Sequence, residues 1–411
     1  MKNDDLGKIP SIRFKGFTNA WEQRKLGDYI IPYNEVTTKN NQYPVFTSSR
    51  KGLFFQTDYY DGNQIASEDN TGYNIVPRGY FTYRHMSDDL VFKFNINNLA
   101  DNGIVSTLYP VFTTTESLDP KYLQYQLNEG EEFKRFAILQ KQGGSRTYMY
   151  LSKLKDMILT MPILDEQIKI STFFTNLDNL ITLHQRKLDK TKELKKTMLS
   201  KMFPKNGEDK PELRFSGFTD AWELRRLSEL FSRGGSGGTP RSTNKSYYNG
   251  KIPFLGISDI SSSNGFIDKT EKYITEEGLN NSSAWIVPAG SISLAMYASV
   301  GKLAILNTDV ATSQAFYNMV FDDDNLRNYI YQRLSKANES GEWTKLISTG
   351  TQANLNADKV KNFDISIPTN KGEMSMISNF FMDLDNLITL HQRELEQLKN
   401  IKKTLLKHMF V

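Results

Sequence analysis

Polar side chains suited to hydrogen bonding with DNA gather in turn-like segments, which recur at comparable places in the two halves of this chain. Arg, Asn and Gln can form paired hydrogen bonds with base edges in the major groove, whereas Lys, Ser, Thr and glycine N–H groups can hold phosphates. Any one of these residues is more often an ordinary loop residue, but their recurrence favours two DNA-recognition surfaces. The candidates are Ser48, Ser49, Arg50, Lys51, Arg78, Arg84, Ser145, Arg146 and Tyr148 in the first half, and Thr239, Arg241, Ser242, Thr243, Lys245, Tyr297, Ser299, Lys302, Thr351, Gln352 and Asn354 in the second.

Residue patterns that would indicate catalysis are missing from the sequence. There is no cysteine and there are only four histidines, so thiolate zinc sites and the usual metal-hydrolase motifs are disfavoured. The glycine-rich segment 234–241 lacks the Gly-Lys-[Ser/Thr] of a phosphate-binding loop. The carboxylate pair Asp88–Asp89 sits in a turn-like stretch and is expected to be solvated. We therefore predict no catalytic residue, no bound cofactor and no metal ligand in this chain.

Composition points to a folded protein with room for two to three domains in 411 residues. The net charge of +4 is compatible with a polyanionic partner, but it is far below that of a DNA-coating protein. No segment approaches the ~20 apolar residues of a membrane span, and the N-terminal residues lack the apolar core of a signal peptide. These features lead us to expect a cytoplasmic protein without a membrane partner.

Two repeated segments organise the chain. The sequence LDNLITLHQR occurs at 177–186 and again at 384–393, and a second motif, Arg-Phe-x-Gly-Phe-Thr-x-Ala-Trp-Glu, occurs at 13–22 and 214–223. Short strand-like runs dominate the regions between them, which differ from each other. We predict an α+β fold with two β-rich α/β target-recognition domains in tandem, each followed by a long helix. The predicted segments are recognition domain 1 (1–164), spacer helix 1 (165–203), a linker (204–211), recognition domain 2 (212–370) and spacer helix 2 (371–411).

The long helices carry a heptad seam that predicts pairing with each other. Residues 165–183 hold three acids and one Lys, whereas 184–201 hold seven basic residues and two acids, and the second copy has the same polarity. Antiparallel pairing places acidic halves beside basic halves, so we predict an antiparallel coiled coil with a pseudo-twofold axis. The residues predicted to pair the helices are Leu177, Ile181, His184, Leu188, Leu384, Ile388, His391 and Leu395.

His184 and His391 fall near the middle of their helices and should meet across this axis. A metal-binding or pH-sensing role is an alternative. Because two histidines are a small ligand set, we favour a register-setting polar layer. The basic half of each helix is similarly interpreted as a solvated face with interhelical pairing, in preference to a DNA-binding surface.

Together these segments make the chain resemble the DNA-specificity subunit of type I restriction–modification systems. The resemblance rests on the two Arg-Phe-x-Gly-Phe-Thr segments, Gly237-Gly-Thr-Pro240, Ser299-Val-Gly-Lys302, Ser313-Gln-Ala-Phe316 and the repeated helices, and it covers nearly the whole chain. The first half lacks the Gly-Gly-Thr-Pro loop and has Phe46-Thr-Ser-Ser-Arg50 instead. Its recognition domain is therefore expected to be of a different subtype.

The resemblance implies a non-catalytic subunit in which each domain reads one half of a bipartite site in double-stranded DNA. It further implies that the helices set the spacing and dock two methyltransferase subunits, which would bind S-adenosylmethionine. Restriction–translocase subunits, which would use ATP and Mg²⁺, complete such a complex. Two rival hypotheses remain: a DNA-independent coiled-coil scaffold, and a methyltransferase or nuclease with its own unrecognised active site.

Overall fold

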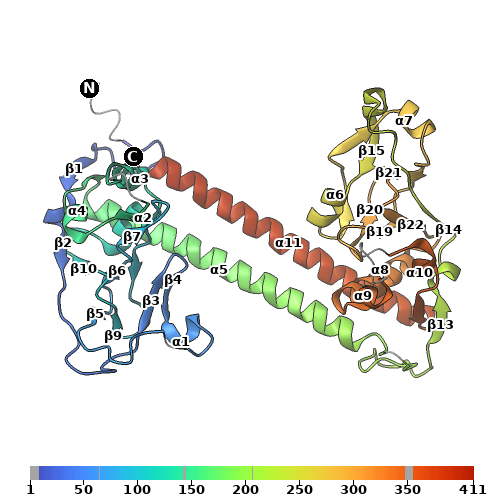
Figure 1. Cartoon of the computed structure of the whole chain (residues 1–411), viewed down its shortest axis with the longest axis horizontal. Helices are drawn as coiled ribbons and strands as arrows, with labels where there is room; N and C mark the ends of the chain where they lie inside the picture. Colours follow the sequence, from blue (N-terminus) through green and yellow to red (C-terminus); the bar gives the residue numbers. More distant parts are fainter. Residues whose placement is uncertain (1–8, 64, 142–144, 206, 348–354) are drawn as a thin grey trace. The chain divides into compact units, whose positions relative to one another are not determined.

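The computed structural model describes residues 9–63, 65–141, 145–205, 207–347 and 355–411. Within these ranges the chain forms two compact units (Figure 1). Unit 1 comprises residues up to Leu183 together with Leu395–Val411, and unit 2 comprises His184–Glu394. Each unit thus contains one recognition domain, one half of each long helix and its own hydrophobic core. The mixed α+β class predicted from the sequence is confirmed.

Unit 1 is built from small antiparallel sheets. A four-stranded sheet has the order β2-β10-β6-β8, and the other strands form the pairs β1-β12, β3-β4, β5-β9 and β11-β7. The strands are β1 (Glu22–Lys25), β2 (Ile30–Pro32), β3 (Phe46–Ser49), β4 (Gly52–Phe55), β5 (Asn74–Pro77), β6 (Phe81–Thr82), β7 (Met86–Ser87), β8 (Asn95–Ile96), β9 (Asn102–Val105), β10 (Val111–Thr114), β11 (Thr147–Tyr148) and β12 (Ile158–Met161). The helices are η2 (Leu26–Asp28), α1 (Gln56–Tyr59), α2 (Pro120–Glu129), α3 (Glu131–Leu139), α4 (Leu151–Lys155) and the first part of α5 (Leu164–Lys201).

Unit 2 has larger sheets, with orders β14-β22-β19-β20-β16 and β17-β15-β21-β18, and the pair β13-β23. The strands are β13 (Glu223–Arg226), β14 (Arg233–Ser236), β15 (Tyr248–Leu255), β16 (Phe266–Ile267), β17 (Lys272–Ile274), β18 (Ile286–Val287), β19 (Ile292–Ala295), β20 (Leu303–Leu306), β21 (Val310–Thr312), β22 (Phe316–Val320) and β23 (Asp364–Ile367). The helices are η3 (Leu227–Glu229), η4 (Lys245–Tyr247), α6 (Ile257–Ser262), α7 (Glu276–Asn280), α8 (Asp324–Glu339), α9 (Glu342–Leu346), α10 (Ala357–Lys361) and the first part of α11 (Lys371–Met409). The two domains therefore share a frame but differ in their sheets.

The shared frame is held by one arginine–carboxylate pair in each unit. Arg13, from the first repeated motif, makes two hydrogen bonds of 2.6 and 2.7 Å with Glu166 in the first turn of α5. Arg214 makes the equivalent bonds of 2.5 and 2.8 Å with Glu373 of α11. Both carboxylates are buried and negative, so they also suit the positive N-terminal end of a helix. The repeated motif thereby fixes each recognition domain to the start of its long helix.

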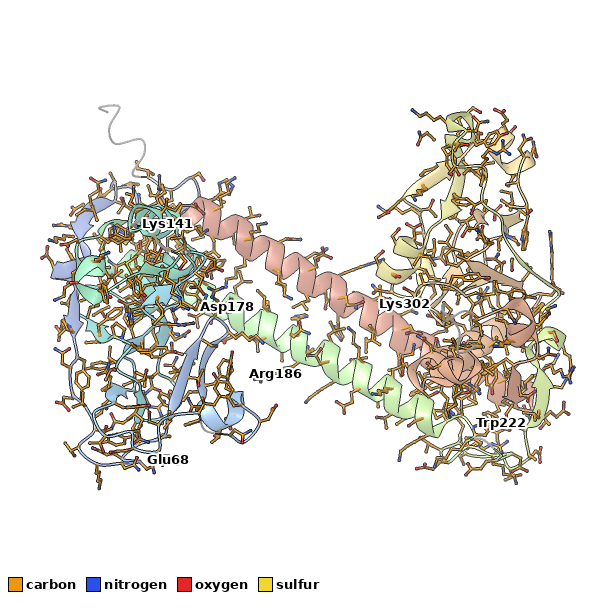
Figure 2. All side chains as sticks on the ribbon, in the orientation of Figure 1. Glu68, Lys141, Asp178, Arg186, Trp222 and Lys302 are labelled. Carbon is orange, nitrogen blue, oxygen red and sulfur yellow. The ribbon has the colours of Figure 1, made fainter. Side chains whose placement is uncertain are left out.

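The long helices run antiparallel in each unit, as predicted. In unit 1, Asp178 of α5 lies 2.7 Å from Lys402 of α11 (Asp178 is labelled in Figure 2). In unit 2 the equivalent residues, Asp385 and Lys195, are 2.6 Å apart. The acidic first half of one helix therefore faces the basic second half of the other, which is the pairing that the charge pattern favours.

The helix ends complete the cores of both domains. Phe410 packs against Tyr122 and Phe174 in unit 1, with ring centroids 5.8 and 5.9 Å apart. In unit 2 Phe203, at the end of α5, packs in the same way against Tyr329 and Phe381. Unit 1 consequently depends on residues from both ends of the described chain.

Candidate nucleic-acid interface

In unit 1, five of the predicted recognition residues line one cavity of about 410 Å³. The β3–β4 hairpin contributes Ser48, Ser49, Arg50 and Lys51, and Arg84 follows strand β6. Ser48 itself is buried, donates a hydrogen bond to the carbonyl of Thr82 and accepts one from Asn95. The Ser48 hydroxyl therefore holds the hairpin from its buried side, whereas Arg50, Lys51 and Arg84 are exposed at the surface.

Arg50 of this cavity and Arg146, which is not among the residues that line it, are each paired with an aspartate. Arg50 donates two hydrogen bonds, of 2.8 and 2.5 Å, to Asp89, and Arg146 donates one of 2.9 Å to Asp88. The Arg50 guanidinium, helped by the Ser87 hydroxyl, lowers the pKa of Asp89 to about 2. This carboxylate is therefore charged at neutral pH. Asp88 and Asp89 are solvated, as expected, but they also hold the arginines in place.

Replacing Asp89 by Asn is expected to tighten binding to non-specific DNA several-fold. The change removes a negative charge and frees the Arg50 guanidinium for a phosphate, which should steepen the salt dependence of binding by roughly one counterion. Fluorescence anisotropy with a duplex at several salt concentrations measures both quantities. Asp101→Asn, at the Arg78 pair, is the matched control. Equal effects of the two variants would contradict a special role for Arg50.

Arg78 lies elsewhere in the domain, since it donates hydrogen bonds to Asp101 and to the carbonyl of Asn98 and is not among the residues that line the cavity. Tyr148 instead belongs to an exposed aromatic group. The ring centroids of Tyr148 and Tyr150 lie 5.8 Å apart in a parallel stack, and the centroid of the buried His85 ring lies 5.2 Å from that of Tyr150. Sequence inspection missed Tyr150, although its spacing of two from Tyr148 placed it on the same side of an extended segment. Exposed rings of this kind can stack on bases or cover sugars.

In unit 2, glycines fix the loop that follows β14. Gly237 and Gly238 are buried, and a Cβ on Gly237 would lie 1.9 Å from the carbonyl oxygen of Thr312. The loop therefore passes against β21 with no room for a side chain. Directly after it, Thr239 donates a 2.7 Å hydrogen bond to Gln314, a residue that we did not predict as part of the site. Arg241, Ser242, Thr243 and Lys245 continue the loop as exposed side chains.

The second predicted loop of unit 2 begins at Tyr297, shortly after strand β19, and Met296 links it to the first loop. The N–H of Met296 donates to the carbonyl of Ala315, the residue next to Gln314, and Tyr297 comes directly after Met296. Ala298 and Ser299 both have positive φ angles, a strained conformation that often occurs at functional sites. Ser299 and Lys302 each lie within hydrogen-bonding distance of Ser261 (Lys302 is labelled in Figure 2). Residues 314–315 thus contact Thr239 of the first loop and Met296 just before the second, whereas Ser299 and Lys302 contact Ser261.

Thr351, Gln352 and Asn354 lie outside the described residues. Ser145, Arg146 and Tyr148 lie just after another undescribed segment and are exposed. The assignment of all these side chains to DNA contacts stays a prediction.

The predicted helix-pairing residues face inward. Leu188, Leu384 and Leu395 are buried, and Leu177, Ile181, His184, Ile388 and His391 are half-buried.

No helix in the described part of the chain is long and apolar enough to cross a membrane.

Comparison with known proteins identifies the family to which this architecture belongs. The family model of the type I restriction modification DNA specificity domain matches residues 2–193 and 219–400, one match in each half. The chain belongs to this family. The resemblance predicted from the repeated segments is accordingly confirmed at the level of the family.

This chain is also similar in sequence to specificity subunits of known type I systems. The MjaIX subunit of Methanocaldococcus jannaschii is 29% identical over 46% of this chain and 44% of its own length. The HindI subunit of Haemophilus influenzae is 28% identical over 41% of this chain and 37% of its own length. The chain thus aligns with less than half of either relative. The putative MjaX subunit of M. jannaschii aligns over 98% of this chain and 94% of its own length, at 21% identity.

Solved structures support the fold. The type I S subunit from M. genitalium has a TM-score of 0.63 at 14% identity and covers 98% of this chain and 99% of its own. A chain from a structure on complex assembly and conformational transition of the type I R-M system has a TM-score of 0.52 at 17% identity, over 96% of this chain and 98% of its own. At these identities the likeness shows that the fold is shared.

Proposed function

We propose that this specificity subunit is non-catalytic and reads a bipartite site in double-stranded DNA, one half with each recognition domain. The observation that carries the proposal is a shared frame with different loops. Equivalent Arg–Glu pairs hold both domains to the helices and equivalent Asp–Lys pairs join the two helices, whereas the recognition loops lie on sheets of different order. Two different surfaces on one frame suit an asymmetric site.

The long helices suit a spacer. Helix α5 has 38 residues and is therefore about 57 Å long, which exceeds one turn of B-DNA at about 34–36 Å. In the proposed function the helices determine the number of base pairs between the half-sites, while the loops determine their sequence.

Docking of two methyltransferase subunits is supported by exposed apolar residues that recur on both helices. Leu180, Leu183 and Leu194 of α5 are 41–48% exposed, and the residues at the same repeat positions of α11, Leu387, Leu390 and Ile401, are 42–51% exposed. Their spacings of 3 and 11 residues keep each set on one helix face. Exposed apolar residues on a shared face mark interaction sites. Each helix would thus present the same surface to one copy of the same partner.

In this proposal the methyltransferase subunits carry S-adenosylmethionine, and the restriction subunits use ATP and Mg²⁺. This chain supplies sequence recognition and assembly. It needs no cofactor for either task, because both depend on hydrogen bonds and buried surface.

Substituting Asp for Leu183 or Leu390 is expected to remove one methyltransferase subunit from the assembled complex, and the double variant to remove both. A charge placed in an apolar interface costs several kcal/mol unless it is paired. Native mass spectrometry of the co-expressed complex gives the stoichiometry. Asp at Lys192, an exposed position on α5 that lies away from the helix face of the apolar set, is the control. Retention of both partners by the double variant would contradict this docking surface.

The decisive test maps N6-methyladenine genome-wide in cells that contain this subunit and its methyltransferase partner. A bipartite motif is expected. Insertion of one heptad into either helix alone should shift the spacer or disrupt assembly and leave the half-site sequences unchanged, whereas a new half-site sequence would refute the spacer role. Methylation by the purified chain alone would show an intrinsic enzyme, and gel shifts that are indifferent to sequence with and without the partner would favour the scaffold hypothesis.

A further inference from the structure

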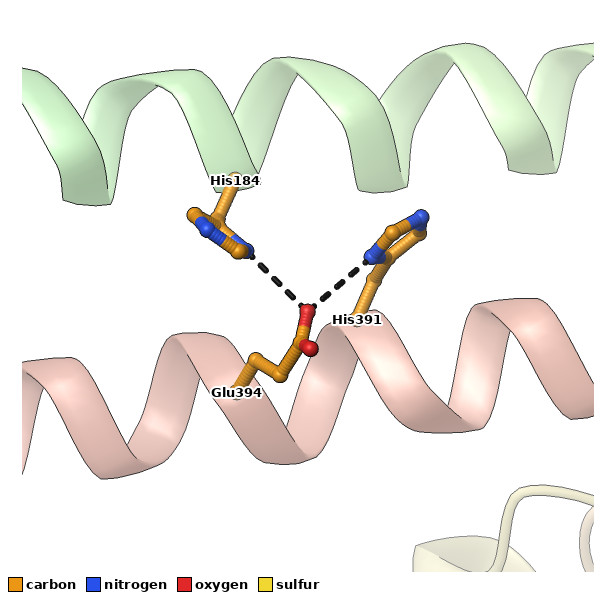
Figure 3. A group of neighbouring side chains, drawn as sticks. All are labelled: His184, His391 and Glu394. Atoms are coloured by element: carbon orange, nitrogen blue, oxygen red, sulfur yellow. Dashed lines mark hydrogen bonds and ion pairs between the residues drawn. The ribbon is translucent and has the colours of Figure 1, made fainter.

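Three side chains that can bind metal meet in the middle of the helix pair in unit 2 (Figure 3). His184 comes from α5, and His391 and Glu394 come from α11. Figure 3 shows both imidazoles turned toward the Glu394 carboxylate, with the Oε2 atom 3.2 Å from Nδ1 of His184 and 3.3 Å from Nδ1 of His391. One ligand atom from each residue lies within 4.8 Å of the others. Sequence analysis predicted the meeting of the histidines but not Glu394.

The spacing of these atoms matches that of ligands around a tetrahedral ion. Zinc binds imidazole nitrogen and carboxylate oxygen at about 2.0–2.2 Å, which places neighbouring ligand atoms of a tetrahedron about 3.3–3.5 Å apart. The two distances from Glu394 Oε2 are already at this value. The two imidazole nitrogens lie within 4.8 Å of each other and would move closer to complete the arrangement.

Nδ1 of His184 gives an independent indication. The atom is buried and makes no hydrogen bond of acceptable geometry within the described residues, although the Glu394 oxygen lies 3.2 Å away. A buried polar atom without a partner is costly, and such atoms in native structures call for an explanation such as a bound ion. A metal ion bound to Nδ1 would give this atom a partner, and its positive charge would offset the negative charge of the Glu394 carboxylate.

We propose that His184, His391 and Glu394 bind one divalent transition-metal ion, with Zn²⁺ as the ion that suits this donor set. Two imidazoles and one carboxylate are an established zinc ligand combination that leaves the fourth position to water. Glu394 is 38% exposed, so a water molecule can reach the ion. Mg²⁺ and Ca²⁺ prefer oxygen ligands and are expected to bind weakly or not at all.

The repeat shows why there is one site and not two. His184 and His391 occupy the same position of LDNLITLHQR, but the residue that corresponds to Glu394 in the first copy is Lys187. Lysine at this position offers no carboxylate to a second ion. The bound ion would fasten α5 to α11, because its ligands come from both helices. This inference does not depend on DNA recognition.

Metal binding is tested on the full chain after treatment with EDTA. Isothermal titration with Zn²⁺ is expected to give one saturable site per chain, and Zn²⁺ should raise the melting temperature, since it binds the folded state. Co²⁺ serves as a spectroscopic probe, because its visible absorption reports coordination by nitrogen and oxygen ligands. Mg²⁺ should produce neither effect.

Variants decide whether these residues are the ligands. Glu394→Gln keeps the size of the side chain, and Glu394→Lys copies the first repeat. Each should weaken Zn²⁺ binding by about 100-fold or more, and His391→Ala should do the same, since even partners outside the ligand shell cost 10–100-fold. Glu396 is exposed on the same helix, so the Glu396→Gln variant is the control and should bind Zn²⁺ as the parent chain does. Circular dichroism checks that each variant is folded. Absence of saturable Zn²⁺ binding, or full binding by folded Glu394→Gln and His391→Ala, would overturn the proposal.

Discussion

Alanine at Gly237 is expected to abolish recognition of the half-site that unit 2 reads, although this residue has no side chain with which to contact DNA. A Cβ there would lie 1.9 Å from the carbonyl oxygen of Thr312 and 2.4 Å from its Oγ1, so the loop must move away from β21. Thr239 and Arg241 follow at once in the loop and would move with it. A displacement of about 1 Å is sufficient to break paired hydrogen bonds to base edges. We expect affinity for the cognate site to fall by at least tenfold, with non-specific binding nearly unchanged.

Gly235 supplies a matched control, because the same substitution two residues earlier meets only the Trp285 indole nitrogen, at 3.9 Å. Gly235→Ala should therefore bind the cognate site as the parent chain does. Binding of both variants is measured by anisotropy with the methyltransferase partner present, on the cognate site and on a site mutated in each half in turn. Equal losses in the two variants, or a loss that tracks the other half-site, would show that the loop does not position the recognition residues of unit 2.

Loss of the Asp385 carboxylate should destabilise unit 2 much more than loss of Asp178 destabilises unit 1, although both belong to the same repeated motif. Asp385 is buried and lies 2.6 Å from Lys195 and 2.7 Å from the amide of Gln332 in α8. Alanine at Asp385 leaves the Lys195 ammonium, 10% exposed, without its partner. Breaking a buried pair in this way costs about 3–5 kcal/mol of folding free energy.

The equivalent pair of unit 1 is more exposed, at 39% for Asp178 and 22% for Lys402, and a hydrogen bond from the hydroxyl of Tyr125 replaces the amide contact. Solvent screens this pair, so Asp178→Ala should cost only about 1–2 kcal/mol. Hydrogen exchange read separately for the amides of each unit measures both losses, since a single melting curve would merge two units. Similar losses in the two units would contradict the importance of burial.

Sequence periodicity and charge were sufficient to predict the long helices and their antiparallel pairing, because both depend on regular spacing along the chain. The Arg13–Glu166 and Arg214–Glu373 pairs were not predicted. They join residues more than 150 positions apart, and no local pattern distinguishes these glutamates from other acids in the first turn of a helix.

Recognition loops were predicted by residue type, and in unit 1 the structure brings five of the predicted residues to one cavity. Which side chains point outward could not be predicted, as Ser48 shows, because its hydroxyl is turned inward by Thr82 and Asn95. Gln314 was missed for the converse reason: only the fold brings it to Thr239. Local sequence limits the composition of a loop, whereas its neighbours in space determine its geometry.

The dependence of unit 1 on the last helix has a consequence for synthesis on the ribosome. Unit 2 is one continuous stretch, His184–Glu394, and can fold as soon as it has been translated. Most of unit 1 is translated before unit 2, yet the ring of Phe410 that covers Tyr122 and Phe174 emerges only after unit 2. Until then these apolar rings of the nascent chain lack their cover and are open to chaperones or to aggregation. The half of the protein that is made first is therefore expected to be the last to mature.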